Sequence, residues 1–353
     1  MLRRLLMVSV VFALVAVAPT AAGAAGPGVV QVRVRFTVQN MNHSPVQCPD
    51  APDGKTYVLA GWLVAPASVL VADPGRRAVT LYLHGPDGDV FHFQGVSGYD
   101  FATEMARLGH ASVVIDRLGY GLSAKPNGFA TCVGAQADMA AQIVTRLRSG
   151  AYATDGPPPA SFGHVAIGGH GPGAMIAQVE AYTFRDVEGL VNLAWSDQGF
   201  SSDATVATTP TFEKCSAGGE PKYAPDGPPG YAFFPESDDA FARLFFSPNT
   251  DPAVASGVTT GRERDPCGDL DSIPAAIAAD HANLREIRVP VVLIFGSLDA
   301  VFPPPSEQLQ AADYTGSSDV TVLVENTGHA LYLERNAPTV RGRLSEWLAG
   351  HGF

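Results

Sequence analysis

The chain has 353 residues, of which 46% are hydrophobic and 16% are charged, and its formal net charge is −12. This length and composition indicate a globular protein with one large domain plus an insertion, and they exclude a disordered chain. A strongly acidic protein repels phosphate backbones, so nucleic acid is excluded as a partner.

The first residues have the pattern of a secretory signal. Arg3 and Arg4 precede an apolar run over residues 5–17, and small residues follow at positions 22–24. This pattern predicts a signal peptide at residues 1–24, cleaved near Ala24, and a secreted, extracellular protein. The apolar run is too short for a transmembrane helix, and no later run of about 18 apolar residues occurs, so no membrane span is expected.

Short apolar runs alternate with amphipathic segments along the rest of the chain. This alternation predicts an α/β fold with a mostly parallel, eight-stranded sheet flanked by helices. The expected strands lie at residues 29–38, 57–64, 79–83, 112–116, 164–167, 189–194, 291–295 and 320–324, and the clearest helices at residues 100–108, 136–148, 173–183 and 339–348. Met139, Ile143, Val144 and Leu147 fall at helical spacing, which predicts a buried stripe rather than a cofactor site.

The alternation stops between residues 197 and 286. This stretch is rich in Pro, Gly and Asp and carries two of the four cysteines. A structureless loop of this length is improbable inside a compact domain, so helices and a disulfide are expected here. We therefore predict a core at residues 25–196 and 287–353 and an inserted cap at residues 197–286.

Four cysteines remain in the expected mature chain: Cys48, Cys132, Cys215 and Cys267. An even number in an exported protein favours two disulfides over free buried thiols. Three pairings are possible. We favour Cys48 with Cys132 and Cys215 with Cys267, because each bond then joins two segments of one part of the fold.

Residues 165–174 combine a buried strand, a tight glycine turn and the start of a helix. This segment resembles the nucleophile elbow of the α/β-hydrolase superfamily, with Gly171 at the apex. Four further segments resemble that superfamily in the same chain order: the oxyanion turn at residues 83–85, the segment at 116–123, the acid turn at 295–299 and the histidine turn at 328–329. The resemblance implies an α/β-hydrolase fold with the order elbow, acid, histidine.

Three positions depart from the pattern of the superfamily. A serine nucleophile needs a hydroxyl at the apex, and Gly171 has no side chain. The two backbone N–H donors of an oxyanion hole would come from Pro86 and Pro172, and proline has no N–H. An engineered serine-to-glycine change would account for Gly171 alone but not for both prolines. A loop register shifted by one residue, in which a different N–H group serves, is the other alternative.

The acid and the base of the resemblance remain, at Asp299 and His329. In the superfamily these residues are hydrogen bonded, and the carboxylate fixes the tautomer of the imidazole. Such a dyad can take a proton from water or from an acidic group of a substrate without a nucleophile. The alternative is that both residues persist only as turn-forming residues.

Other residues are weaker candidates for the pocket. His84 and His170 are expected either to donate into the pocket or to bond nearby backbone. Asp87 and Asp89 follow the oxyanion turn. Either could replace a missing N–H donor only if strong desolvation kept its carboxyl group protonated. The simpler interpretation is that both are solvated acids of the loop. Trp195 and Asp197 follow the sixth expected strand, where some members of the superfamily place the acid, but Asp299 matches the acid turn better. Tyr120 is expected either to line an apolar pocket or to pack in the core.

The histidines show no HExxH pattern and the cysteines no CxxC spacing, so no metal is expected, and no nicotinamide or flavin fingerprint accompanies the strands. Three hypotheses remain: a general-base enzyme acting on a small apolar or amphipathic molecule by cyclisation, elimination, rearrangement or water attack, a non-catalytic binding protein, and a conventional esterase or lipase. The sequence does not fix the oligomeric state.

Overall fold

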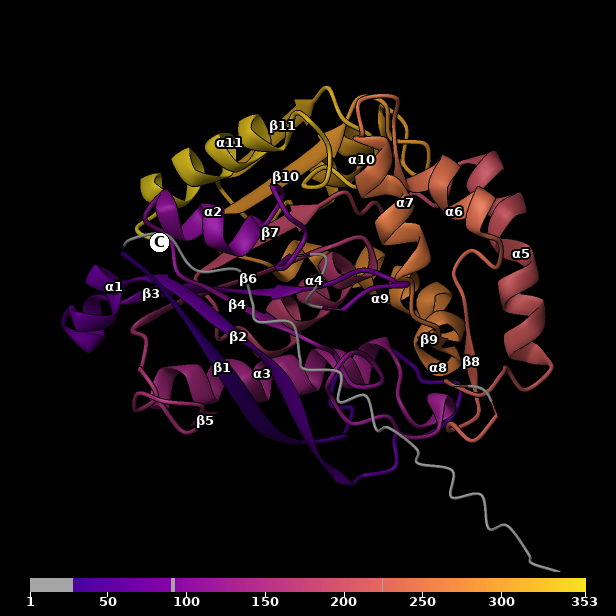
Figure 1. Ribbon diagram of the computed structural model, residues 1–353, viewed down its shortest axis with the longest axis horizontal. Helices are drawn as coiled ribbons and strands as arrows, with labels where there is room; N and C mark the ends of the chain where they lie inside the picture. Colours follow the sequence, from indigo (N-terminus) through magenta and orange to yellow (C-terminus); the bar gives the residue numbers. More distant parts are fainter. Residues whose placement is uncertain (1–27, 90–92, 224) are drawn as a thin grey trace, which may run out of the picture.

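The computed structural model describes residues 28–89, 93–223 and 225–353 (Figure 1). The predicted signal peptide and its cleavage position near Ala24 lie outside the described residues. No helix among those described is long and apolar enough to cross a membrane.

A nine-stranded sheet forms the centre of the described molecule, in the order β11-β10-β7-β6-β3-β4-β2-β1-β5. Its strands are β1 (Val29–Gln39), β2 (Thr56–Pro66), β3 (Ala78–Leu83), β4 (Ser112–Ile115), β5 (Ala153–Thr154), β6 (His164–His170), β7 (Gly189–Leu193), β10 (Val291–Gly296) and β11 (Val320–Glu325). Neighbours from β4 to β11 are parallel, whereas β2 pairs antiparallel with both β1 and β4.

All eight expected strands are present. The sheet has one further strand, β5, so the predicted count of eight is corrected to nine. This strand pairs only Ala153 and Thr154 with Arg35 and Val34 of β1. Two residues are too few to give an alternating pattern, so the sequence carries no signal for it.

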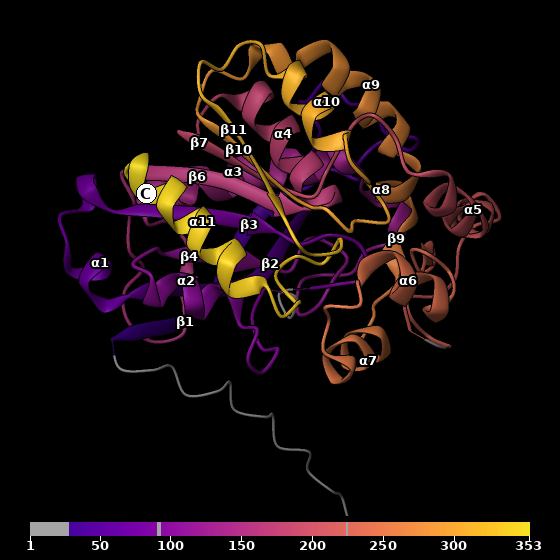
Figure 2. The ribbon, with the colours of Figure 1, turned by 90° about the horizontal axis from the view of Figure 1, so that it is seen from above.

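Helices cover both faces of the sheet. Figure 2 shows α2 (Phe101–Arg107) and α11 (Ala337–Gly350) on one side, and α4 (Pro172–Phe184), α9 (Ile273–Asn283) and α10 (Ser306–Asp313) on the other. Helix α3 (Val133–Ser149) packs against α4. It begins three residues before its predicted start, and its expected stripe of Met139, Ile143, Val144 and Leu147 is buried.

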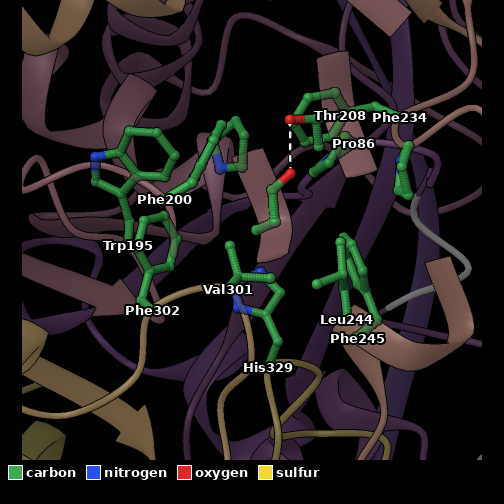
Figure 3. A pocket seen from close by; sticks show the side chains of 13 residues that line it. Pro86, Trp195, Phe200, Thr208, Phe234, Leu244, Phe245, Val301, Phe302 and His329 are labelled. Carbon is green, nitrogen blue, oxygen red and sulfur yellow. Dashed lines mark hydrogen bonds between the residues drawn. The ribbon is translucent and has the colours of Figure 1, made fainter. Parts of the chain in front are cut away.

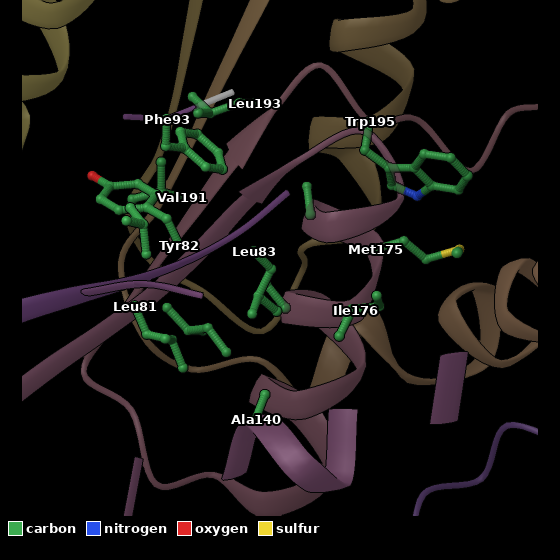
Figure 4. Packing of buried hydrophobic residues seen from close by; sticks show 14 of the residues in the cluster. Leu81, Tyr82, Leu83, Phe93, Ala140, Met175, Ile176, Val191, Leu193 and Trp195 are labelled. Atoms are coloured by element: carbon green, nitrogen blue, oxygen red, sulfur yellow. The ribbon is translucent and has the colours of Figure 1, made fainter. Parts of the chain in front are cut away.

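The core lies between these helices and the central strands. Figure 4 shows Leu81 and Leu83 of β3 near Ile176 of α4, with Val191 and Leu193 of β7 in the same cluster. Because central parallel strands are covered on both faces, they consist of continuous apolar runs rather than alternating ones.

Residues 197–286 contain several short elements at one end of the molecule (Figure 1). They are α5 (Ser202–Ser216), β8 (Tyr231–Ala232), α6 (Asp238–Phe245), α7 (Pro252–Thr260), β9 (Asp265–Pro266) and α8 (Cys267–Asp271). The same stretch ends with α9, which packs against α4, and the 3-10 turn Leu284–Glu286. The remaining short helices are α1 (Ala67–Val71) and the 3-10 turns Pro74–Arg76 and Gly128–Ala130. The helices expected in residues 197–286 are present, and the assignment of these residues as a cap remains a prediction.

Two disulfides join the favoured partners. Cys48 is bonded to Cys132 at the start of α3, and Cys215 of α5 is bonded to Cys267 of α8. The predicted pairing is therefore confirmed. The second bond ties two helices of the 197–286 segment together.

Candidate active site

The turn between β6 and α4 has the sharp geometry that the glycines of the sequence indicate. Gly171 has φ +51° and ψ −129°, a conformation in which a side chain is strained. Gly173 is required by close packing, because a Cβ atom there would lie 2.1 Å from the carbonyl oxygen of Leu83. The two glycines let α4 begin directly against β3.

His329 and Asp299 meet at the carboxyl end of the sheet. His329 Nδ1 lies 2.9 Å from Asp299 Oδ2, and both side chains are buried. The other carboxylate oxygen, Oδ1, accepts hydrogen bonds from the backbone N–H groups of Val301 and Phe302 at 2.8 and 2.9 Å. The carboxylate is thus fixed by its own turn, and its bond to Nδ1 leaves Nε2 as the acceptor nitrogen of a neutral imidazole.

The acceptor nitrogen of His329 faces the elbow. A Cβ atom built on Gly171 would lie 3.5 Å from His329 Nε2 and 3.9 Å from Pro86 Cδ. Pro172 is the first residue of α4 and follows Gly171 directly. The structure therefore brings together Gly171, His329 and both prolines, and neither proline carries an N–H group.

A small cavity lies above this group (Figure 3). The space between its lining atoms is about 330 Å³, of which only about 10 Å³ admits the centre of a water molecule. This corresponds to roughly one water position. The described lining residues are Pro86, Pro172, Trp195, Phe200, Ala204, Thr208, Phe234, Pro235, Leu244, Phe245, Val301, Phe302 and His329. More than half of them come from the 197–286 segment.

Trp195, one of the weaker pocket candidates, lines this cavity. Its indole N–H donates to Asp197 Oδ1 at 2.8 Å, and Gln310 donates to the other carboxylate oxygen at 2.8 Å. Burial raises the pKa of Asp197 above its ordinary value. Asp197 therefore holds the indole in place, while Asp299 is the acid that contacts His329.

His170 and His84 bond to the backbone, and neither belongs to the described lining of the cavity. His170 Nε2 lies 2.9 Å from the carbonyl oxygen of His329, so it fixes the histidine turn. His84 Nδ1 lies 2.8 Å from the carbonyl oxygen of Gly85, and its Nε2 accepts from the N–H of Arg117 at 3.1 Å. Of the two alternatives for these histidines, the bond to nearby backbone is the one that the structure shows.

Asp87 is not the solvated loop acid that the sequence suggests. It is fully buried with φ +56°, and its Oδ1 accepts from the N–H of Phe234 and from Arg262, at 3.0 and 3.1 Å. Its own N–H donates to Asp265, which also accepts from the hydroxyl of Tyr120 at 2.7 Å. Asp87 and Tyr120 thus belong to a buried charged cluster beside the cavity, not to its described lining.

Burial dominates the electrostatics of this cluster. It raises the pKa of Asp87 well above the ordinary value, and the nearby Asp265 carboxylate raises it further. Burial also raises the pKa of Asp265, to about 6. Arg262 opposes the shift at Asp87, as it contacts Asp87, Asp238 and the carbonyl oxygen of Pro235.

Glu334 is a buried residue that sequence reasoning missed. Its Oε1 accepts from the N–H groups of Gly328 and Ser247, both at 2.9 Å, and its Oε2 accepts from the Ser247 hydroxyl at 2.6 Å. The N–H of Ala330 donates to the carbonyl oxygen of Phe245 at 2.9 Å. The histidine turn is therefore bonded directly to the end of α6. No local motif marks Glu334, because its partner Ser247 is 87 residues away.

Among the described residues, no group of three or more His, Cys, Asp or Glu side chains is arranged to hold a metal ion. His329, which contacts Asp299, is the residue of the described lining with an ionisable side chain.

The fold and site together define an α/β protein with an elbow, an acid turn and a histidine turn at the carboxyl end of its sheet. The profile of the Alpha/beta hydrolase family matches residues 80–341, well over half of the chain. The chain therefore belongs to the alpha/beta hydrolase family, and the predicted α/β-hydrolase fold is confirmed.

Solved structures with the same fold include an esterase, a lipase and a lactonase. A malate-bound thermophilic esterase from Thermogutta terrifontis is 18% identical with a TM-score of 0.60, over 90% of this chain and 100% of that one. A monoacylglycerol lipase from Paleococcus ferrophilus is 18% identical with a TM-score of 0.55, over 79% and 96%. An enol-lactonase from Burkholderia xenovorans LB400 is 12% identical with a TM-score of 0.57, over 83% and 97%. At these identities the likeness concerns the fold alone. No curated protein matches the sequence.

Proposed function

We propose that this protein is a general-base enzyme in which His329, oriented by Asp299, takes a proton from a small apolar molecule without forming a covalent acyl intermediate. One observation carries the proposal: His329 Nε2 faces a turn residue, Gly171, that has no side chain. The base and its carboxylate are in place, whereas the group that a base would activate in a serine hydrolase is missing.

The two prolines support the same proposal. An acyl-transfer transition state needs N–H donors toward its oxyanion, and losing one donor typically costs about 2.7–4 kcal/mol of stabilisation. Pro86 and Pro172 occupy both donor positions of the resemblance and line the cavity. Ester hydrolysis through a tetrahedral intermediate is therefore disfavoured at this site, and proton abstraction leading to elimination, cyclisation or rearrangement, or direct attack by water, is favoured.

The proposal predicts catalysis on a neutral probe of general bases. In nitrobenzisoxazole, a base removes the ring C–H proton while the N–O bond breaks. The electron pair of the N–O bond moves onto oxygen, and the product is a cyanophenolate. We expect the wild-type protein to accelerate this reaction above the buffer rate, because Nε2 accepts the proton and Asp299 stabilises the resulting imidazolium.

The matched variants are His329→Ala and His281→Ala, the second being an exposed histidine of α9. The first is expected to lose at least 100-fold of the acceleration, in line with general-base contributions. The second is expected to react like the wild-type protein. Equal rates in the wild-type protein and His329→Ala would contradict the proposal.

The tightness of the cavity favours a second candidate function, a binding protein without chemistry. Only about 10 Å³ admits the centre of a water molecule, so a bound ligand must displace lining residues. Thermal-shift screening of the wild-type protein and of the His329→Ala, Asp299→Asn double variant separates the candidates. Equal ligand-induced shifts with no catalysis by either protein would favour binding alone.

We also propose that residues 1–24 direct export and that residues 197–286 act as a cap. The two disulfides, which persist in oxidising compartments, support export. Sequencing of the amino terminus of the protein recovered from the culture medium tests this proposal. A start near residue 25 is expected, and retention of the whole chain inside cells would contradict it.

A further inference from the structure

The described lining of the cavity offers a ligand almost no hydrogen-bond donor. Thr208 Oγ1 donates to the carbonyl oxygen of Ala204 at 2.8 Å within α5, and the indole N–H of Trp195 donates to Asp197. A hydroxyl has one proton, so Thr208 in this arrangement presents only acceptor capacity to the cavity. Pro86 and Pro172 add no N–H group. The remaining polar atom directed at the space near Gly171 is Nε2 of His329.

Positive charge near the cavity is already paired. Arg262 lies in the neighbouring cluster, where it contacts Asp87, Asp238 and the carbonyl oxygen of Pro235, and its side chain is 1% exposed. It is not among the described lining residues. A carboxylate or phosphate, which arrives already charged and brings no proton for His329, would therefore lose its hydration without finding a cationic partner in place, which is strongly unfavourable.

Aromatic side chains form opposite sides of the cavity. Figure 3 shows Trp195, Phe200 and Phe302 together on one side, Leu244 and Phe245 on the other, and His329 between them. The rings of Trp195 and Phe302 have their centroids 5.3 Å apart, and those of Phe245 and His329 are 4.9 Å apart at nearly a right angle. Because a ligand must displace lining residues to enter, a flat, conjugated molecule that packs against these rings is favoured over a bulky aliphatic one.

From these observations we propose that the substrate is a neutral, conjugated hydroxyaromatic or enol whose negative charge, after loss of its proton, is delocalised over the ring system. This inference rests on the proposed role of His329 and specifies what that base acts on. In the step, the O–H bond breaks, its electron pair stays on the substrate oxygen, and the proton forms an N–H bond at Nε2. No group leaves and no oxidant is consumed.

Delocalisation is required because the site lacks donors for a localised oxyanion. A conjugated anion places less charge on any one atom, so it depends less on the missing N–H groups. Its counter-charge is the imidazolium of His329, which Asp299 stabilises from the opposite side at 2.9 Å. The anion of an aliphatic alcohol, or a tetrahedral adduct, would concentrate its charge on one oxygen and would not be stabilised by delocalisation.

Three coumarins of similar size test the substrate class: hydroxycoumarin, methoxycoumarin and a coumarin carboxylate. Affinity is measured by calorimetry, and the ionisation of bound hydroxycoumarin by its absorbance. We expect both neutral compounds to bind at least tenfold more tightly than the carboxylate. We also expect bound hydroxycoumarin to be ionised at a pH where the free dye is neutral.

The variant His329→Ala separates the ligand class from the base. It is expected to bind both neutral coumarins within about threefold of the wild-type protein but to hold hydroxycoumarin in its neutral form. His281→Ala is the control and is expected to ionise the dye normally. Because methoxycoumarin cannot ionise, its binding also reports whether the variant is folded.

Binding of the carboxylate as tightly as the neutral compounds, or no binding of either neutral compound, would overturn the proposed substrate class. Selective binding of the neutral coumarins without ionisation by the wild-type protein would retain the ligand class but overturn His329 as the base. The failure of the substrate class and the failure of the proposed function therefore give different results.

Discussion

Two buried regions meet at the Pro86–Asp87 turn, and they differ in how many charged side chains they contain. On one side, the cavity has apolar walls and directs the acceptor nitrogen of His329 toward Gly171. On the other side, Asp87, Asp265 and Arg262 form a cluster in which each charged group contacts several partners. Burial alone therefore does not mark a functional group, since the reactive candidate is the one whose acceptor nitrogen faces the cavity beside Gly171.

The charged cluster also joins the core to the 197–286 segment. Asp87 comes from the loop after β3, whereas Asp265 and Arg262 belong to the 197–286 segment. On the cavity side, the histidine turn is joined to α6 through Glu334 and Ser247. Each region can therefore be weakened separately, which allows the comparison to be tested.

The largest effect is expected on the charged side. Arg262→Met retains a stem to pack on Phe241 but leaves the Asp87 carboxylate without its cation. Breaking a buried ion pair typically costs 3–5 kcal/mol, so we expect about that loss in the free energy of unfolding, measured in urea. Addition of Asp87→Asn should recover part of it.

Arg243→Ala is the control for that variant, because its ion pair with Asp203 is half exposed. Exposed pairs are worth about 0–1 kcal/mol. A similar loss in both arginine variants would show that the cluster holds no buried pair of consequence.

A smaller effect concerns the pH dependence of stability. Burial raises the pKa of Asp265 from 3.8 to about 6, so the folded protein binds this proton more tightly than the unfolded chain. The resulting stabilisation is complete below about pH 4 and is lost as pH rises to about 6, amounting to about 3 kcal/mol at most. Asp265→Asn should remove this part of the slope in unfolding experiments.

The exposed Asp239→Asn serves as the control for the titration and should keep the slope of the wild-type protein. If Asp265→Asn also keeps the full slope between pH 4 and 6, then Asp265 is not the group that titrates there.

On the cavity side, Glu334→Ala is expected to cost about 2 kcal/mol, since it leaves the buried N–H group of Gly328 and the partly buried N–H group of Ser247 without their acceptor. Benzisoxazole elimination should fall about tenfold, and the low-field proton resonance of the His329–Asp299 hydrogen bond should broaden. Glu334→Gln retains an acceptor oxygen and should restore the resonance and most of the rate. Loss of stability with an unchanged resonance would limit Glu334 to a structural role.

The smallest effect on stability is expected at the elbow. Gly171→Ser places a side chain at φ +51°, which costs about 1 kcal/mol, at the low end for a strained residue. The cost stays low because the nearest described atoms lie 3.5 Å or more from the new Cβ. A loss of more than about 3 kcal/mol in the free energy of unfolding, measured by thermal unfolding, would contradict the claim that a side chain fits between Gly171 and His329.

The sequence predicted what local patterns encode. Apolar runs marked the eight long strands, the glycine turn marked the elbow at Gly171, and an even cysteine count indicated two disulfides. Each of these signals lies within a short stretch of chain or follows from a simple count.

Other features depend on residues that are distant along the chain. The burial of Asp87 follows from Asp265 and Arg262, which are more than 170 residues away. Likewise, Glu334 acts through Ser247, and β5 forms only because two residues reach the edge of β1. No periodicity or motif announces such contacts, so they could not be predicted from the sequence.

The central claim is that the site holds a base without a nucleophile, and fluorophosphonate labelling followed by mass spectrometry tests it most directly. The wild-type protein is expected to remain unlabelled, whereas Gly171→Ser, which places a hydroxyl beside His329 Nε2, should become labelled at residue 171. Labelling of the wild-type protein at any serine, in proportion to the protein present, would contradict the account.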